Sequence, residues 1–147
     1  MQHKVDLLVD APANDVGAAL ADLSTYPHWN DLVHAAEPDS ETGSWSTTLR
    51  AQVGPLARSK QLRFIRVRDS KEPGMRAVRF EREELDGRDH AHWVMEASVV
   101  EVDDASSRVT LMLSYSGGLW MPALGSVLTG AIERATKKLP EYVNSRT

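Results

Sequence analysis

Arg63 and Tyr115 carry polar groups but lie in stretches of alternating apolar residues, where a side chain can face the interior of the protein. Arg63 alternates with Ile65 and Val67. If these three side chains face an interior, the guanidinium is placed to pair with a carboxylate or phenolate of a bound molecule. A solvent-facing arginine is the alternative, and it is favoured because arginine is seldom fully buried. Tyr115 ends another apolar alternation, so it too combines a polar group with an expected interior position.

No metal-binding or nucleophilic motif accompanies these residues. His90 and His92 share one face of a strand, a spacing that a metal would accept, but no third ligand of suitable type is evident. The sequence has no cysteine, which excludes a thiol nucleophile and a thiolate metal site. It also has no phosphate-binding loop, no G-x-S-x-G elbow and no paired acids. We therefore expect no metal and no cofactor, and binding is favoured over catalysis.

Alternating apolar residues predict six strands that position these side chains. The strands cover residues 4–9, 44–53, 59–69, 78–83, 93–99 and 109–115. In the third strand, Leu62 and Phe64 have one parity whereas Ile65 and Val67 have the other, which predicts a bulge near residues 64–65. The strands from residue 44 onward are joined by short turns and should be antiparallel neighbours, because a parallel crossover needs a dozen or more residues.

Helical periodicity predicts two short helices and one long one. Val16, Leu20 and Leu23 repeat at helical spacing after Pro12, and Ser24, Thr25 and Pro27 favour a second short helix over residues 26–33. The long helix spans residues 122–143, where the apolar residues occupy one face. That face needs a large apolar partner, which the inward sides of the strands provide.

The residues between the strands and the long helix form either a ligand cavity or an ordinary core. Packing is favoured for any single residue, because large apolar side chains are normally buried for stability. Tryptophan and tyrosine also carry polar groups that seek partners when buried. Trp120, in the apolar loop 119–121, either lines an entrance or packs on Tyr26 or Trp29. The expected ligand-binding residues are Trp45, Leu49, Phe80, Trp93, Met95, Leu111, Leu113, Tyr115, Trp120, Leu128 and Ile132.

Length and charge narrow the class of protein. A chain of 147 residues fits one domain, residues 1–147, with a single core. Its net charge of -4 argues against nucleic acid or an anionic membrane as the main partner, because both attract basic surfaces. No apolar run reaches the length of a signal peptide or a membrane span, so we expect a cytoplasmic protein without integral membrane association.

Three short motifs give the sequence a family resemblance. Asp10-Ala11-Pro12, Leu20-Ala21-Asp22 and Tyr26-Pro27-His28-Trp29, followed by the strands and the long helix, resemble the START-like (SRPBCC, Bet v 1-like) superfamily, in its polyketide cyclase/dehydrase-type or coenzyme-Q-binding-type branch. The resemblance implies an α+β helix-grip fold, in which a seven-stranded antiparallel sheet wraps around a long C-terminal helix and two short helices follow the first strand. It also implies a ligand cavity between sheet and helix, and cyclases of this family use buried arginine and tyrosine to polarise poly-ketone chains.

Three hypotheses for function follow. The first is binding or transport of a small hydrophobic or amphipathic molecule, such as a lipid, a quinone or a polyketide-like aromatic, in a cavity between sheet and helix. The second is a cyclase, aromatase or dehydratase that folds a flexible substrate and uses Arg63 or Tyr115. The third is a protein-interaction module with a larger partner, which a core without a cavity would favour.

Overall fold

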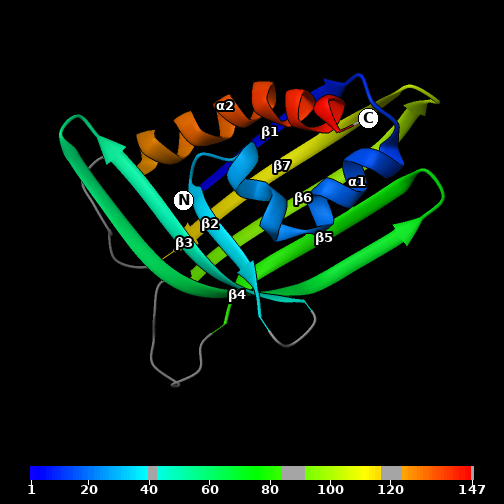
Figure 1. The fold of residues 1–147 in the computed structure, drawn as a ribbon. Coiled ribbons are helices and arrows are strands. Elements are labelled where there is room, and N and C mark those ends of the chain that lie inside the picture. Colours follow the sequence, from blue (N-terminus) through cyan, green and yellow to red (C-terminus); the bar gives the residue numbers. More distant parts are fainter. Residues whose placement is uncertain (40–42, 84–91, 117–123, 147) are drawn as a thin grey trace.

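In a computed structural model of the protein, an antiparallel sheet carries the helices on one side (Figure 1). The structure describes residues 1–39, 43–83, 92–116 and 124–146. In chain order the elements are β1 (Gln2–Val9), α1 (Ala13–Ala21), the 3₁₀ helix η1 (Leu23–His28), β2 (Val33–Pro38), β3 (Ser44–Val53), β4 (Leu56–Glu72), β5 (Met75–Arg82), β6 (His92–Asp103), β7 (Ser106–Ser116) and α2 (Leu124–Ser145).

Within the described residues the sheet has seven strands in the order β1-β7-β6-β5-β4-β3-β2, and every neighbouring pair is antiparallel. Strands β2 to β7 follow one another across the sheet. β1 pairs with β7 at the opposite edge, because α1 and η1 carry the chain across the concave face between β1 and β2. This arrangement confirms the predicted helix-grip fold, with short helices after the first strand and a long helix at the end.

Strand β2 is the element that periodicity did not predict. The expected second helix over residues 26–33 is wrong in its extent, because η1 ends at His28 and Val33 already begins a strand. Only Val33 and Ala36 of β2 are buried, and the pairing with β3 shifts between Val33 and Ala35. This shift breaks the alternation of period two, and Ala, Glu and Pro are uncommon in strands. The segment therefore lacks the usual signals of a strand.

The bulge in β4 lies two or three residues beyond its predicted place. The pairing of β4 with β5 shifts between Arg66 and Arg68, so that Val67 is the extra residue and is 45% exposed. Before the shift, Leu62 and Phe64 are buried on the concave face and Arg66 shares their parity. Arg63 and Ile65 consequently lie on the convex face. Figure 1 shows β4 curving along the sheet, as expected because bulged strands bend.

The core lies between α2 and the concave face, as the apolar patterns predict. Leu128 and Leu139 of α2 are fully buried, and Val127 and Tyr142 pack against the core at its edge. In β6 and β7, buried side chains on the concave face alternate with half-buried or exposed side chains on the convex face. From β6 and β7 the core receives Trp93, Met95, Ala97, Val99, Val109, Leu111, Leu113 and Tyr115.

Helix α1 covers the other end of the concave face and is held by arginines. Arg76 of β5 forms two hydrogen bonds with the carboxylate of Asp69, at 3.0 and 2.9 Å, and these bonds hold the pKa of Asp69 below its usual range. Arg66 donates to the carbonyl of Ala21, at the last turn of α1, at 2.8 Å. Gly17 allows α1 to lie directly on Arg76, because a Cβ atom at Gly17 would stand 3.2 Å from the Arg76 Cδ atom.

Gly17→Val tests this close approach. The added side chain must displace Arg76 or Val99, and overpacking of this kind destabilises a protein by about 1–3 kcal/mol. Ala18→Val, on the exposed side of the same helix, is the matched control and should change stability by less than about 0.5 kcal/mol. Urea unfolding measures both. Equal stabilities of the two variants would show that α1 does not depend on contact at Gly17.

Candidate functional site

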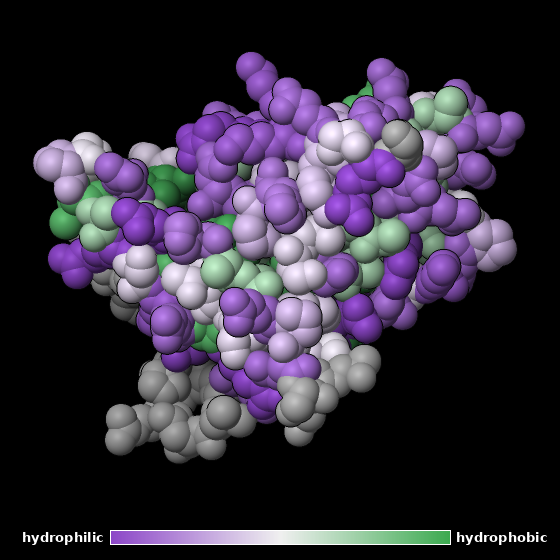
Figure 2. Space-filling model, viewed as in Figure 1, coloured by the Kyte–Doolittle hydropathy of each residue, from purple (hydrophilic) through white to green (hydrophobic). Residues whose placement is uncertain are grey.

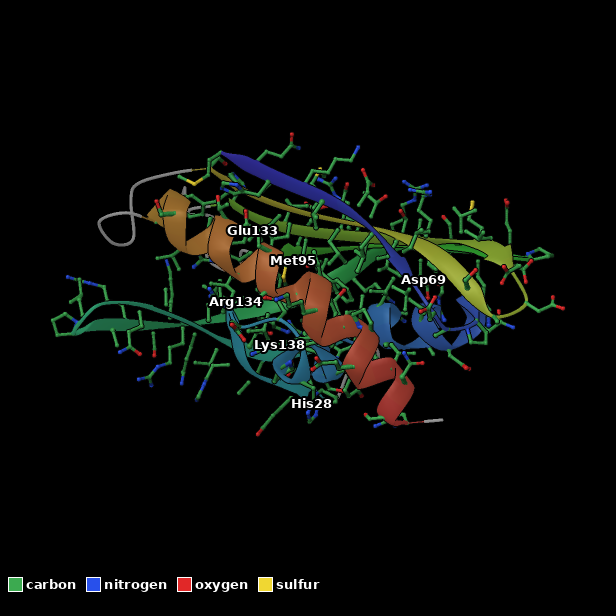
Figure 3. The ribbon with its side chains drawn as sticks, turned by 90° about the horizontal axis from the view of Figure 1, so that it is seen from above. His28, Asp69, Met95, Glu133, Arg134 and Lys138 are labelled. Atoms are coloured by element: carbon green, nitrogen blue, oxygen red, sulfur yellow. The ribbon has the colours of Figure 1, made fainter. Side chains whose placement is uncertain are left out.

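The candidate site is the space between α2 and the concave face of the sheet. Residues of β6 and β7 form its floor, α2 forms its roof, and η1 closes one side. Figure 3 shows Met95 extending from the sheet toward α2. A small pocket of about 20 Å³ lies here, and its lining includes Tyr26, Trp29, Met95, Leu111, Leu113 and Ile132. A volume of this size holds about one water molecule, so the described side chains pack closely.

The structure brings ten of the eleven expected ligand-binding residues to this interior. Trp45, Leu49, Phe80, Trp93, Met95, Leu111, Leu113, Tyr115, Leu128 and Ile132 are each at most 8% exposed. Trp120 lies outside the described residues. The sequence left open whether this region is a cavity or a core, and the described part of it is a core with one small pocket. A role in binding for these residues stays a prediction.

Tyr26 and Trp29 are interior residues that the sequence analysis did not place in the site. Their rings pack together with centroids 4.3 Å apart, and Tyr26 also meets the edge of Phe80. Both polar groups have partners: the Tyr26 hydroxyl donates to the carbonyl of Leu20 at 2.8 Å, and Trp29 Nε1 donates to Thr25 Oγ1 at 3.2 Å. Burial raises the pKa of Tyr26, so its hydroxyl stays protonated. The Tyr-Pro-X-Trp motif was the available signal for both.

Trp45 differs from Trp29 in one respect. It is 5% exposed and packs edge-on against Phe80, with centroids 5.4 Å apart, while the guanidinium of Arg66 lies 5.7 Å from its ring. Its indole Nε1 is buried and has no hydrogen-bond partner among the described residues. A buried donor without an acceptor destabilises a fold by about 1–3 kcal/mol. The interior therefore contains a donor that an oxygen atom of a bound molecule would satisfy.

A second polar region lies where β5 and β7 end and β6 begins. Trp93 is paired in register with Tyr115, and the two rings are 4.5 Å apart. Burial raises the pKa of Tyr115, and the nearby positive charge of Arg82 partly opposes this shift. Arg82 shares the concave parity of Phe80 and is opposite Phe64 in the register. This end of the interior thus combines a phenol with a cation.

Arg63, the cation that the sequence singled out, does not point toward this interior. It lies on the convex face, where it pairs with Asp39 at 2.8 Å and with Glu83 at 2.6 Å and donates to Ser44 Oγ at 3.1 Å. The solvent-facing alternative is therefore the observed one. The physical reason is the position of the bulge: because it falls at Val67, Arg63 keeps the parity opposite to Leu62 and Phe64. The concave position belongs to Arg66.

No described group of His, Asp or Glu side chains has the arrangement of a metal site. His92 begins β6 and is exposed. His90, its expected neighbour on the same strand face, lies outside the described ranges, so the spacing of the two rings is not tested.

An open groove of about 480 Å³ runs along the interior between α2 and β3. This groove is larger than the pocket inside the core. Both β3 and α2 contribute apolar and charged residues to it. The lining consists of Asp31, Leu32, Arg50, Ala51, Gln52, Ser126, Val127, Gly130, Ala131 and Arg134. Because Leu32, Ala51 and Ala131 are also core residues, the floor of the groove is continuous with the core.

Asp31 links the segment between η1 and β2 to α2 at this groove. It follows η1 and accepts hydrogen bonds from Arg134 and Lys138, which lie one turn apart on α2. Figure 3 shows both cations on the same side of the helix. Partial burial raises the pKa of Asp31, but the hydrogen bonds and charges of Lys138 and Arg134 outweigh burial and lower it overall. These ion pairs hold α2 beside the groove.

Comparisons with known proteins place this fold. No protein-family model matches the sequence, and no curated protein matches it either. Among solved structures, a START superfamily protein from Mycobacterium smegmatis has a TM-score of 0.74 at 15% identity, with 99% of each chain covered. Human StAR-related lipid transfer protein 5 has a TM-score of 0.76 at 11% identity, covering 99% of this chain and 76% of that one. The protein therefore has a START-like, helix-grip fold.

One further similar structure is that of an enzyme, an aromatase/cyclase. The Zhui aromatase/cyclase from Streptomyces sp. R1128 has a TM-score of 0.61 at 17% identity, with 99% of this chain and 92% of that one covered. Lipid-transfer proteins and an aromatase/cyclase thus share this architecture, and a fold does not choose between such functions. None of the helices in the described residues is both long and apolar enough to span a membrane.

Asp31→Asn tests whether the ion pairs hold α2 in place. The variant should lose about 1 kcal/mol of unfolding free energy at pH 7, since partly exposed pairs contribute modestly. Because the pKa of Asp31 is lowered in the folded state, its stabilisation is complete above the ordinary carboxyl pKa of about 3.9 and is lost as the pH falls through the folded value. The difference from the unchanged protein should therefore vanish at low pH.

Asp104→Asn, in the exposed turn between β6 and β7, is the control for this measurement. Urea unfolding at pH 7 and at several lower pH values compares the two variants. A loss in Asp104→Asn equal to that in Asp31→Asn would contradict a specific role for the α2 ion pairs.

Proposed function

We propose that the protein binds a small hydrophobic or amphipathic molecule, such as a lipid, a quinone or a polyketide-like aromatic, between α2 and the concave sheet. The observation that carries this proposal is the buried indole N–H of Trp45, which has no acceptor among the described residues. A carbonyl or hydroxyl oxygen on a mainly apolar ligand would accept this hydrogen bond. The rings and aliphatic side chains around Trp45 would hold the apolar part.

The groove between β3 and α2 supplies the route to this site. Leu32, Ala51 and Ala131 line this groove and also belong to the core, so they give a hydrophobic molecule apolar contacts on its way to the interior. The pocket of about 20 Å³ is too small for such a molecule, so α2 or the side chains beneath it must move when the molecule binds. The fold shared with lipid-transfer proteins supports the same class of ligand.

Native mass spectrometry of the protein purified from its own host tests this proposal. A co-purifying small molecule is the expected result. Trp45→Phe keeps the ring packing but removes the N–H, and it should lower occupancy by about fivefold, the effect of one hydrogen bond. Trp29→Phe is the matched control, because the Trp29 N–H already has an acceptor within the protein.

Fluorescence of N-phenyl-1-naphthylamine, an apolar dye, gives a second readout that needs no co-purified molecule. Displacement of the dye by fatty acids, quinones or polycyclic aromatics is expected. If no molecule co-purifies and none of these compounds displaces the dye, the proposal fails. If Trp29→Phe weakens binding as much as Trp45→Phe does, the free N–H of Trp45 is not the recognition element.

A cyclase-type reaction is the second candidate, and the nearness of Arg82 to Tyr115 is the observation that favours it. The cation would stabilise an enolate formed in a poly-ketone chain, and the protonated phenol would donate a hydrogen bond to the enolate oxygen. Both groups lie on the concave face, in contrast to Arg63. The similar fold of an aromatase/cyclase supports this alternative.

Turnover of a linear poly-β-ketone thioester separates binding from catalysis. If the protein is a cyclase, Tyr115→Phe and Arg82→Gln should each lower the rate by about 100-fold, the effect of removing one group that stabilises an oxyanion. Arg63→Gln should leave the rate unchanged, because its guanidinium pairs with Asp39 and Glu83 on the opposite face. Product analysis by liquid chromatography measures all three. A protein that binds the thioester without converting it is a carrier.

A further inference from the structure

The β3–β4 hairpin is strongly basic, although the net charge of the whole chain is negative. From residue 43 to residue 68 the sequence contains Arg50, Arg58, Lys60, Arg63, Arg66 and Arg68 and no Asp or Glu. The whole chain has 17 basic and 21 acidic residues, so the remainder is strongly acidic. The net charge of -4 therefore does not describe the surface of this hairpin. The argument that a negative net charge disfavours an anionic membrane does not hold for this part of the surface.

Among these cations, the three nearest the tip of the hairpin have no carboxylate within ion-pair distance in the described part of the chain. Arg63 pairs with Asp39 and Glu83, and Arg66 lies 3.8 Å from Asp69. The other cations near the tip, Arg50, Arg58 and Lys60, have no such pair among the described residues. Burial and the charge of Arg82 lower the pKa of Lys60, so an added anion would stabilise its charged form.

The tip of the hairpin is apolar and projects from the molecule. Gly54 and Pro55 form a two-residue turn, with Gly54 at φ +57°, a conformation that favours glycine at the first turn position. Leu56 is 38% exposed and Ala57 is also exposed. Figure 1 shows the hairpin extending past the first turn of α2, and Figure 2 shows hydrophobic and hydrophilic residues side by side at that end.

We propose that the β3–β4 hairpin docks the protein on an anionic lipid bilayer, with Pro55, Leu56 and Ala57 entering the interface and Arg50, Arg58 and Lys60 contacting the lipid phosphates. An apolar tip flanked by cations fits this partner, because the interface accepts apolar side chains and the anionic surface attracts each nearby Lys or Arg. An acidic protein surface would satisfy the cations but would not require an exposed leucine at the tip.

Docking in this orientation places the groove next to the lipid. Arg50, Ala51 and Gln52 of the hairpin are also one wall of the groove, whose other wall is α2. The bilayer contact shares Arg50 with the groove, but none of the docking residues is the buried donor Trp45 or a residue of the small pocket, so docking and ligand binding can be tested separately.

Co-sedimentation with vesicles tests the docking. The protein should bind vesicles of 70% phosphatidylcholine and 30% phosphatidylserine, and binding should decrease in high salt and be absent with phosphatidylcholine alone. Arg50→Gln/Arg58→Gln should weaken binding by about 25-fold, at about fivefold for each cation removed. Lys71→Gln/Arg108→Gln is the matched control: it removes two exposed cations at the other end of the sheet and should bind normally.

Insertion of the tip is tested separately. Leu56→Ser should weaken vesicle binding by about tenfold, whereas Val102→Ser, which changes a residue 55% exposed at the other end of the sheet, should not. Because the chain has no cysteine, Ala57→Cys gives one labelling site for an environment-sensitive dye. Its emission should shift to the blue with anionic vesicles, and the emission from Asp104→Cys should not.

Absence of binding to the anionic vesicles overturns the proposal, and so does an equal loss of binding in the hairpin and control variants. Salt-sensitive binding without any shift at Ala57→Cys also overturns it, because the tip then stays in water, as on an acidic protein. Circular dichroism confirms that each variant is folded. If the protein does not bind vesicles but its ligands still displace the dye, docking fails and ligand binding stands. If the protein binds vesicles but no compound displaces the dye, ligand binding fails and docking stands.

Discussion

The register shift at Val67 is the constraint on which the remaining structure depends. β4 pairs with β3 along its first half and with β5 along its second, and the extra residue lets the strand bend between them. The shift also brings Arg66 and Asp69, three residues apart, to the same side of the sheet. There Asp69 binds Arg76 beneath α1. One inserted residue thus curves the sheet, anchors α1 and leaves the hairpin projecting past α2.

Much of the fold could be predicted because its two periodicities are strong. The inward residues of β3, β6 and β7 alternate strictly, and the buried face of α2 follows helical spacing, so both surfaces of the core were identified from the sequence. β2 could not be found this way. Its pairing shifts within six residues, and its stability comes from its partner β3 and from η1 rather than from its own pattern.

The site was harder to predict, because an error of two or three residues in the position of a bulge reverses a side chain. With the bulge near residue 64, Arg63 faces the interior, whereas with the bulge at Val67 its place belongs to Arg66. The buried N–H of Trp45 and the groove have no signature in the sequence. Both depend on which atoms of distant segments meet: Trp29 finds Thr25 nearby, whereas Trp45 is surrounded by rings and a guanidinium.

The uneven distribution of charge has a consequence for orientation as well as affinity. A cationic hairpin on an otherwise acidic body gives the molecule an electrostatic asymmetry, so a negatively charged surface attracts one end and repels the rest. Attraction alone would leave the protein free to rotate over that surface. The apolar tip and the repulsion of the body together restrict the rotation. Because β3 is both a hairpin strand and a groove wall, the orientation that satisfies the cations also turns the groove toward the lipid.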